Sequence, residues 1–161
     1  MIHVGANPPL QGILFRPAVV PRDTLENIYS TREFTINQVH KNFYQKAHWT
    51  SARWDENEFE KVGLQEEYID DYHPPFVKES KIKALLTFKE RHMIQTNQTT
   101  MLVGEIKELI IEDGLIGEDG FLDLEKAETV TVSGLDSYHT TQSLGRLEYA
   151  KPGKTPRHLE K

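Results

Sequence analysis

Residues 82–112, IKALLTFKERHMIQTNQTTMLVGEIKELIIE, decide the fold of this 161-residue chain. Two runs rich in apolar residues, 82–94 and 99–112, are separated by a short polar segment. Runs of this kind are typical of β-strands, and the pair Asn97–Gln98 between them predicts the tip of a hairpin. The stretch therefore predicts two long antiparallel strands joined by a tight turn.

Shorter elements flank this hairpin on both sides. The patterns predict strands over 10–16, 33–39 and 129–135, helices over 20–31, 40–48 and 55–64, a loop over 65–81 and an acidic turn region over 112–126. The first helix has Asp23 or Thr24 as its cap, with Glu26 completing a capping box. Short helices inserted between antiparallel strands favour a mainly β fold, a β-barrel or an α+β arrangement, over alternating βαβ units.

The segment GANPPLQGILFRP, residues 5–17, predicts a turn followed by a strand. Only Met1 to Val4 precede the turn, and these residues resemble the end of an earlier strand. The chain is therefore expected to begin inside a hairpin.

Composition limits the classes of function. The chain has 19 basic and 25 acidic residues and a net charge of −6, which argues against a nucleic-acid surface. No apolar stretch approaches the roughly 18 residues of a membrane span, so no membrane partner is expected. No signal peptide is visible. Cysteine is absent, which excludes disulfides and thiolate chemistry and is compatible with a cytoplasmic location.

Known nucleotide and metal motifs are also absent. The chain contains neither G-x-G-x-x-G after a strand nor a P-loop motif. Its seven histidines are scattered, although His40 and His48 are spaced to share one helix face. Structural or surface roles are expected for the histidines, and no metal site is predicted. The acidic turn does not match the calcium-loop template.

Two segments carry the residue types that bind phosphate. Arg16 ends a strand, and Asp23 and Thr24 begin a helix, whose free N–H groups favour an anion. A second segment, AHWTSARW, adds hydroxyl and guanidinium groups from Thr50, Ser51 and Arg53. The alternative is that Thr24 only caps its helix and that the arginines are solvated. Trp49 and Trp54 likewise belong either to the core, which is the default, or to the wall of a flat aromatic ligand.

An ordered series of segments resembles the flavin reductase-like family of FMN-binding split barrels, on its flavoredoxin-like branch. The segments are HVGANPPLQGILFRP, PRDTLENIYSTREFTIN, AHWTSARWDENEFEKVGL, HPPFVKES, LVGEI, EDGFLDL and SGLDSYHTTQSLGRLEYAKP. Together they span nearly all of residues 3–152. The resemblance implies a six-stranded antiparallel Greek-key barrel, a homodimer, and FMN near the subunit interface. It also implies hydride transfer from NADH or NADPH to the flavin in many members, and electron transfer in others.

The resemblance, combined with the chemistry above, implies a set of cofactor-binding residues. The FMN phosphate is expected near Arg16, Thr24 and Asn27, with Thr50 and Ser51 in a second loop. Asn7 is expected near the flavin ring, and His48 near the phosphate. No catalytic side chain is assigned, because hydride transfer to a flavin requires no acid–base residue from the protein.

In the family, further β-strand sequence precedes the segment that matches HVGANPPL, so the resemblance implies an N-terminally truncated barrel. We expect a split-barrel flavin-binding domain over 1–150, partial at its N-terminus, and a flexible tail over 151–161. The leading hypothesis is an FMN-dependent NAD(P)H:flavin oxidoreductase or an electron-transfer relative. The alternative is a non-catalytic split-barrel remnant that binds flavin weakly or not at all.

Overall fold

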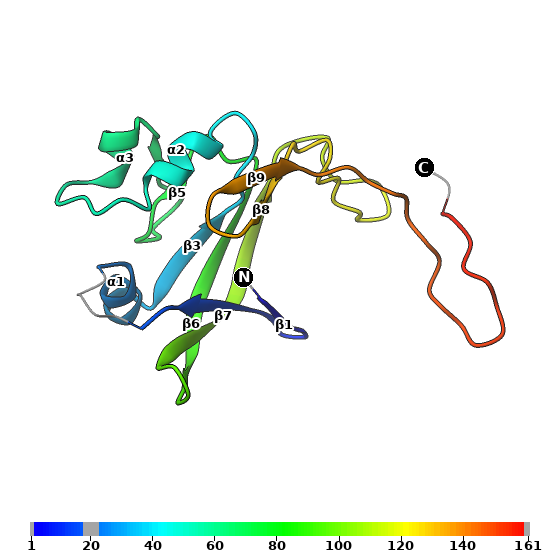
Figure 1. The fold of residues 1–161 in the computed structure, drawn as a ribbon, viewed down its shortest axis with the longest axis horizontal. Helices are drawn as coiled ribbons and strands as arrows, with labels where there is room; N and C mark the ends of the chain where they lie inside the picture. The colour runs from blue at the N-terminus through cyan, green and yellow to red at the C-terminus, as the bar shows by residue number, and fades with distance from the viewer. Residues whose placement is uncertain (1, 18–22, 160–161) are drawn as a thin grey trace.

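The computed structural model describes residues 2–17 and 23–159 of the chain. Its largest element is a five-stranded sheet in which all neighbouring strands are antiparallel (Figure 1). The strand order across the sheet is β1–β2–β7–β6–β3. The strands are β1 Ile2–Ala6, β2 Pro9–Phe15, β3 Glu33–Asn37, β6 Ile82–Ile94 and β7 Thr99–Ile111.

Strands β6 and β7 form the long hairpin that the sequence predicts. The last pair before the turn is Ile94 with Thr99, and Gln98 adopts a left-handed conformation with φ of 60°. The register shifts twice, once after Leu85 and once after Phe88. Such irregularities bend a strand and increase its twist. The sheet is therefore bent and twisted along β6 and β7.

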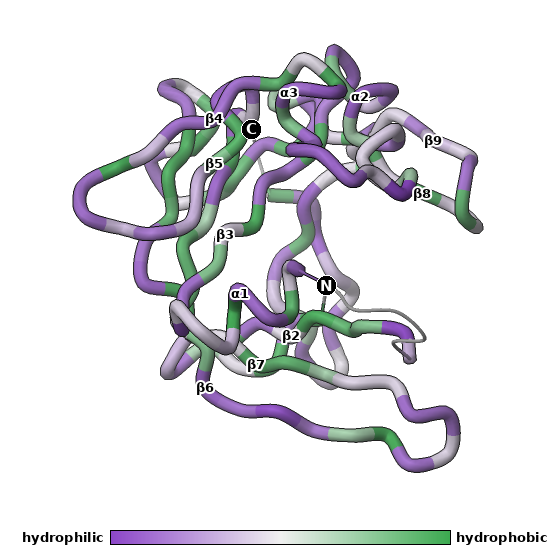
Figure 2. Tube along the Cα trace, turned by 90° about the vertical axis from the view of Figure 1, so that its left-hand side faces the viewer, coloured by the Kyte–Doolittle hydropathy of each residue, from purple (hydrophilic) through white to green (hydrophobic). Residues whose placement is uncertain are grey.

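The principal core lies on the face of this sheet that α1, Asp23–Thr31, covers. Strand β2, an apolar stretch in Figure 2, lies beside this helix. A Cβ atom at Gly104 of β7 would lie only 2.6 Å from a ring carbon of Phe34. Glycine at this position therefore makes room for the aromatic ring. The buried members of the core are Ile28, Phe34, Ala84, Leu86, Phe88 and Leu102.

The N-terminal hairpin confirms the expectation that a strand precedes the first turn. β1 pairs with β2, which pairs in turn with β7. Within the described residues no strand pairs with the outer edge of β1. The sheet is therefore open at this edge.

Three helices are described, and each overlaps a predicted one: α1, α2 Tyr44–Trp49 and α3 Glu58–Val62. α3 begins after Asn57, whose side chain accepts a hydrogen bond from the Phe59 N–H at 2.8 Å. It ends at Gly63, where φ is 68°. These are the usual signals for the start and end of a helix.

Two small hairpins complete the body. β4, Glu66–Glu67, pairs with β5, Phe76–Val77, inside the segment predicted as a loop. β8, Val130–Ser133, pairs with β9, Ser137–Thr140. The strand predicted over 129–135 is thus only half of a hairpin, because the chain turns at Gly134 with φ of 66°.

The last described residues form an arm. We define the arm as residues 144–159, which extend away from the sheet on the side opposite α1 and α3 (Figure 1). The chain folds back on itself within the arm, where Leu147 bridges to His158. Residues 151–159 of the predicted tail over 151–161 fall in the outer part of this arm, and residues 160–161 lie outside the described residues. The flexibility of the tail stays a prediction.

The architecture is that of a mainly β split barrel with short inserted helices, and within the described residues the sheet does not close on itself. None of the helices in the described part is long and apolar enough to span a membrane.

Candidate functional site

The junction between β2 and α1 holds three of the predicted site residues. Arg16 directly follows β2, and α1 begins at Asp23; residues 18–22 lie outside the described residues. Thr24 and Asn27 lie three residues apart on α1, so they share one face. A neighbouring face of the helix packs into the core through Leu25 and Ile28. Packing of the apolar face thus turns the polar face outward.

The polar groups at this junction are available for a ligand. Arg16, Thr24 and Asn27 are exposed. Across the part of the chain that the structure describes, no hydrogen bond or ion pair occupies the Arg16 guanidinium or the Thr24 hydroxyl. A guanidinium, a hydroxyl and the positive end of a helix dipole form a donor set that suits a phosphate.

The second predicted group lies at the end of α2. The Thr50 hydroxyl donates to the Ala47 carbonyl at 2.7 Å, and the Ser51 N–H donates to the His48 carbonyl at 3.0 Å. Thr50 therefore helps to end the helix, and its hydroxyl proton is already used. Ser51 is exposed, and no hydrogen bond to its hydroxyl is found among the described residues.

His48 contacts a residue that the sequence analysis did not select. Its Nδ1 lies 3.0 Å from the hydroxyl of Tyr138 on β9, and the two rings meet edge to face at 5.6 Å. Tyr138 also packs against Tyr44 of α2, with ring centres 5.2 Å apart. The β8–β9 hairpin is thus tied to α2 by aromatic contacts.

A shallow cavity of about 410 Å³ lies between these two elements. Its wall combines aromatic rings with charged and hydroxyl groups, which is the mixture found in small-molecule sites. The lining residues are Lys41, Tyr44, Val130, Asp136, Ser137, Tyr138, His139 and Thr140. His139 is held by the Ser133 hydroxyl at 2.8 Å. None of these residues was predicted, because the two halves of the cavity are about ninety positions apart in the sequence.

The predicted residues therefore fall into separate groups. Arg16, Thr24 and Asn27 lie together at the β2–α1 junction, and His48, Thr50 and Ser51 lie together at the end of α2. Asn7 lies apart from both, in the turn between β1 and β2. Among the described residues no hydrogen bond or ion pair links one group to another.

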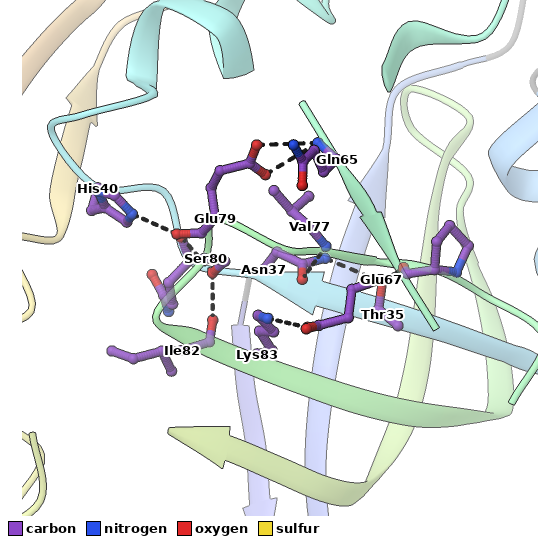
Figure 3. Close-up of polar contacts among 12 residues, drawn as sticks. Thr35, Asn37, His40, Gln65, Glu67, Val77, Glu79, Ser80, Ile82 and Lys83 are labelled. Atoms are coloured by element: carbon purple, nitrogen blue, oxygen red, sulfur yellow. Dashed lines mark hydrogen bonds and ion pairs between the residues drawn. The ribbon is translucent and has the colours of Figure 1, made fainter. Parts of the chain in front are cut away.

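A buried polar network fixes the segment that leads into α2 (Figure 3). His40 is buried; its Nε2 lies 2.7 Å from the Glu79 carbonyl, and its Nδ1 accepts from the Asn42 N–H at 3.4 Å. Both ring nitrogens of His40 are therefore engaged by the backbone. Ser80 contacts the carbonyls of Gln38 and Ile82 at 2.8 and 2.9 Å.

This network bears on one difference from prediction. His40 precedes α2 and does not share a helix face with His48, since the chain turns over 41–43 before the helix begins. The role of His40 is structural, as expected. In the described part of the chain no group of three or more histidine or acidic side chains is placed to hold a metal ion.

The two tryptophans pack against each other. Their ring centres lie 5.3 Å apart, and Trp54 Nε1 donates to the Trp49 carbonyl at 3.1 Å. Trp49 is 52% exposed, so the default expectation of a core residue is wrong for this side chain. The pair forms an aromatic surface beside Thr50 and Ser51.

Comparison with known proteins settles the family. Residues 1–125 match the model of the flavin reductase like domain. The chain belongs to this family. A candidate flavin reductase with a split barrel domain from Shewanella frigidimarina NCIMB 400 is 47% identical, with a TM-score of 0.88 over 92% of this chain and 75% of that chain.

More distant relatives show the same fold. Nitrilotriacetate monooxygenase component B from Bacillus cereus is 21% identical, with a TM-score of 0.78 over 91% of this chain and 75% of that chain. Flavoredoxin from Desulfovibrio vulgaris is 21% identical, with a TM-score of 0.71 over 94% of this chain and 78% of that chain. An uncharacterised protein from Aquifex aeolicus is 28% identical over 107 residues, or 65% of this chain, and the match spans about half of that protein, 54%.

Proposed function

We propose that this chain binds FMN and carries hydride or electrons through it, as an NAD(P)H-dependent flavin oxidoreductase or an electron-transfer flavoprotein. The observation that carries the proposal is the match of residues 1–125 to the flavin reductase like domain. The 47% identity with a split-barrel protein described as a candidate flavin reductase supports it. The bound flavin supplies the redox chemistry, since its ring accepts a hydride and passes electrons on.

The protein's part begins with the phosphate of FMN. The Arg16 guanidinium would form a charge-assisted bond with it, and the Thr24 hydroxyl and the first N–H groups of α1 would donate further hydrogen bonds. Asn27, one turn along the same face, would extend this donor set. Because the anchor takes a terminal phosphate, we expect FMN to bind more tightly than FAD.

The aromatic cavity beside α2 offers a second contact, for a flat ring. Tyr44 and Tyr138 present their rings there, and aromatic faces stack well on planar heterocycles. His48 would orient Tyr138 through their hydrogen bond. Ser51, and Thr50 as an acceptor, would contribute polar contacts at the neighbouring end of α2. Asn7 lies in the turn between β1 and β2 and does not line this cavity, so its contact with the ring stays a prediction from the sequence.

Assembly and location complete the proposal. We propose a homodimer, because the resemblance to the flavin reductase-like family implies one. NADH or NADPH is the proposed electron donor. A cytoplasmic location, with which the lack of cysteine is compatible, is part of the same proposal.

The proposal is tested by titrating the purified chain with FMN and with FAD, following the flavin fluorescence. We expect saturable quenching with FMN at lower concentration than with FAD. NADH or NADPH added without oxygen should then bleach the absorbance of the bound flavin. Binding without bleaching by either nucleotide would leave an electron-transfer protein and exclude the reductase. No binding of either flavin would favour the non-catalytic alternative.

A further inference from the structure

We propose that the arm, residues 144–159, binds a nucleotide that carries two or more phosphate groups. The site is the cavity between the two limbs of the arm, to which the proposed function gives no role. The arm extends on the side of the sheet opposite α1, so this site is separate from the phosphate anchor proposed at Arg16 (Figure 1). The inference goes beyond the flavin chemistry proposed above and does not depend on it.

The arm is a loop that projects from a fixed base. At the base, Arg146 pairs with Asp119 at 2.6 Å, and its guanidinium carbon lies 4.1 Å from the centre of the Phe121 ring. Within the arm, the Leu159 N–H donates to the Arg146 carbonyl at 2.9 Å and joins the two limbs. The position of the loop relative to the body is therefore set at its base.

The loop encloses a cavity of about 840 Å³. Sites for small molecules commonly measure about 300–1,000 Å³, so the cavity has room for a nucleotide. All the lining residues belong to the arm: Leu147, Glu148, Tyr149, Lys151, Lys154, Thr155, Pro156, Arg157 and Leu159.

The wall of this cavity carries three cations, Lys151, Lys154 and Arg157, and one acidic residue, Glu148. All three cations are exposed, and within the described residues no ion pair or hydrogen bond occupies their side-chain nitrogens. Like charges gathered around one cavity repel each other. A ligand with several negative charges removes this repulsion and accepts charge-assisted hydrogen bonds, which favours a ligand with two or more phosphates.

The charge of the rest of the protein makes this cluster distinctive. The chain has a net charge of −6, and cations of the body such as Lys41, Lys83 and Lys89 each pair with a carboxylate. The arm holds its cations away from those carboxylates (Figure 1). An anionic ligand is therefore repelled by the body as a whole and attracted to the arm.

The remaining side chains of the wall favour a nucleotide over an inorganic polyphosphate. Tyr149 is 89% exposed, and its ring contacts no other ring among the described residues. A free aromatic ring stacks on a nucleobase. The Thr155 hydroxyl and the Glu148 carboxylate also have no partner in the described part of the chain. The hydroxyl can donate to a phosphate, and the carboxylate can accept from the hydroxyl groups of a ribose.

Isothermal titration calorimetry of the native chain, without flavin, tests the proposal with ADP, AMP, adenosine and pyrophosphate. We expect ADP to bind about 10-fold or more tightly than AMP, since one more charge-assisted contact contributes about a decade in affinity. Adenosine and pyrophosphate should each bind more weakly than ADP. The absence of saturable ADP binding up to about 1 mM would overturn the proposal. Pyrophosphate binding as tight as that of ADP would overturn the assignment to a nucleotide.

Single variants show whether the arm holds the ligand. Lys154→Gln should weaken ADP binding by about 10-fold, because it removes one phosphate contact. Lys78→Gln is the matched control, since it removes the same charge at an exposed position outside the arm and should change the ADP affinity by less than about 2-fold. An equal fall in both variants would mean that ADP responds only to net charge, and the site would be wrong.

The base contact has a test of its own. Tyr149→Ser should weaken the binding of ADP and leave that of pyrophosphate unchanged, because pyrophosphate has no ring to stack. A parallel fall for both ligands would overturn the stacking role of Tyr149.

A further variant separates this site from the proposed flavin site. If Arg16→Ala abolishes ADP binding while Lys154→Gln keeps it, the nucleotide occupies the β2–α1 junction and the arm proposal is wrong. A native chain that binds FMN but not ADP overturns the arm site and leaves the flavin proposal standing. A chain that binds ADP through the arm but does not bind FMN gives the opposite result.

Discussion

At the scale of single residues, Tyr29 of α1 carries a polar atom without a partner. Its hydroxyl is buried, and no hydrogen-bond partner is found for it among the described residues. Its ring packs edge to face against Phe88, with centres 5.6 Å apart. The ring thus contributes apolar contacts to the core, while the hydroxyl has lost its hydrogen bonds to water.

Replacing this residue tests whether the hydroxyl is indeed unpaired. We expect Tyr29→Phe to leave the free energy of unfolding unchanged or to raise it by up to about 1 kcal/mol, because the ring packing stays. Urea denaturation measures this free energy of unfolding. Tyr72→Phe is the matched control: the Tyr72 hydroxyl donates to Glu108 at 2.5 Å, and this hydrogen bond is the main cause that raises the pKa of Tyr72. Tyr72→Phe should lower stability, and a larger loss from Tyr29→Phe would contradict the assignment.

At the scale of elements, one ion pair joins the small sheet to the large one. Lys83 of β6 is buried and pairs with Glu67 of β4 (Figure 3). The two side chains are unequal, since that of Lys83 is 8% exposed and that of Glu67 is 34% exposed. The carboxylate can be hydrated without its partner, but the ammonium cannot.

This inequality predicts which partner is costlier to remove. Glu67→Gln should lower the free energy of unfolding by about 2–3 kcal/mol, near the lower end for breaking a buried pair, because it leaves a buried charge unpaired. Lys83→Met keeps the chain length without the charge and should cost less than half as much. Thermal or urea denaturation of both variants compares them, and the reverse order would mean that the ammonium reaches water.

The base of the arm has a pH dependence of its own. The pKa of Asp119 is lowered, chiefly by the hydrogen bond from Arg146 and then by the Phe121 backbone N–H. A lowered pKa means that the contact stabilises the structure above the ordinary carboxyl pKa and is lost as the pH falls through the lowered value. We expect Arg146→Gln to raise the pKa of Asp119 toward its ordinary value, as followed by carboxyl NMR titration. An unchanged pKa would show that Arg146 does not hold this carboxylate.

The sequence predicts elements well where a long pattern specifies them. The β6–β7 hairpin could be predicted because its two strands, thirteen residues each, are long and rich in apolar residues and flank a polar turn. β4 and β5 contain two residues each, too few for any period to appear. β9 was missed because Ser137–Thr140 is polar, and pairing with β8 rather than burial forms it.

At the scale of the whole molecule, the candidate functional site shows a second limit of prediction from sequence, which is that residues far apart in the chain come together only in the fold. A phosphate site at the β2–α1 junction could be proposed from the sequence because Arg16 and Thr24 are close in sequence and their chemistry suits a phosphate. The aromatic cavity could not, because Tyr138 reaches His48 only through the packing of β9 on α2. The projection of the arm is likewise a tertiary feature, and the sequence predicted only a flexible tail over 151–161.

The most direct test of the proposed phosphate anchor compares the affinity for FMN with the affinity for riboflavin. Both affinities are measured for the native chain and for Arg16→Ala. Riboflavin lacks the phosphate that the junction is proposed to bind. We expect the native chain to prefer FMN, and Arg16→Ala to weaken FMN binding about 10-fold or more, since a charge-assisted bond contributes about 1.5–3 kcal/mol. Riboflavin affinity should not change. An equal fall for both ligands, no change for either, or no binding of FMN by the native chain would contradict a phosphate anchor at Arg16.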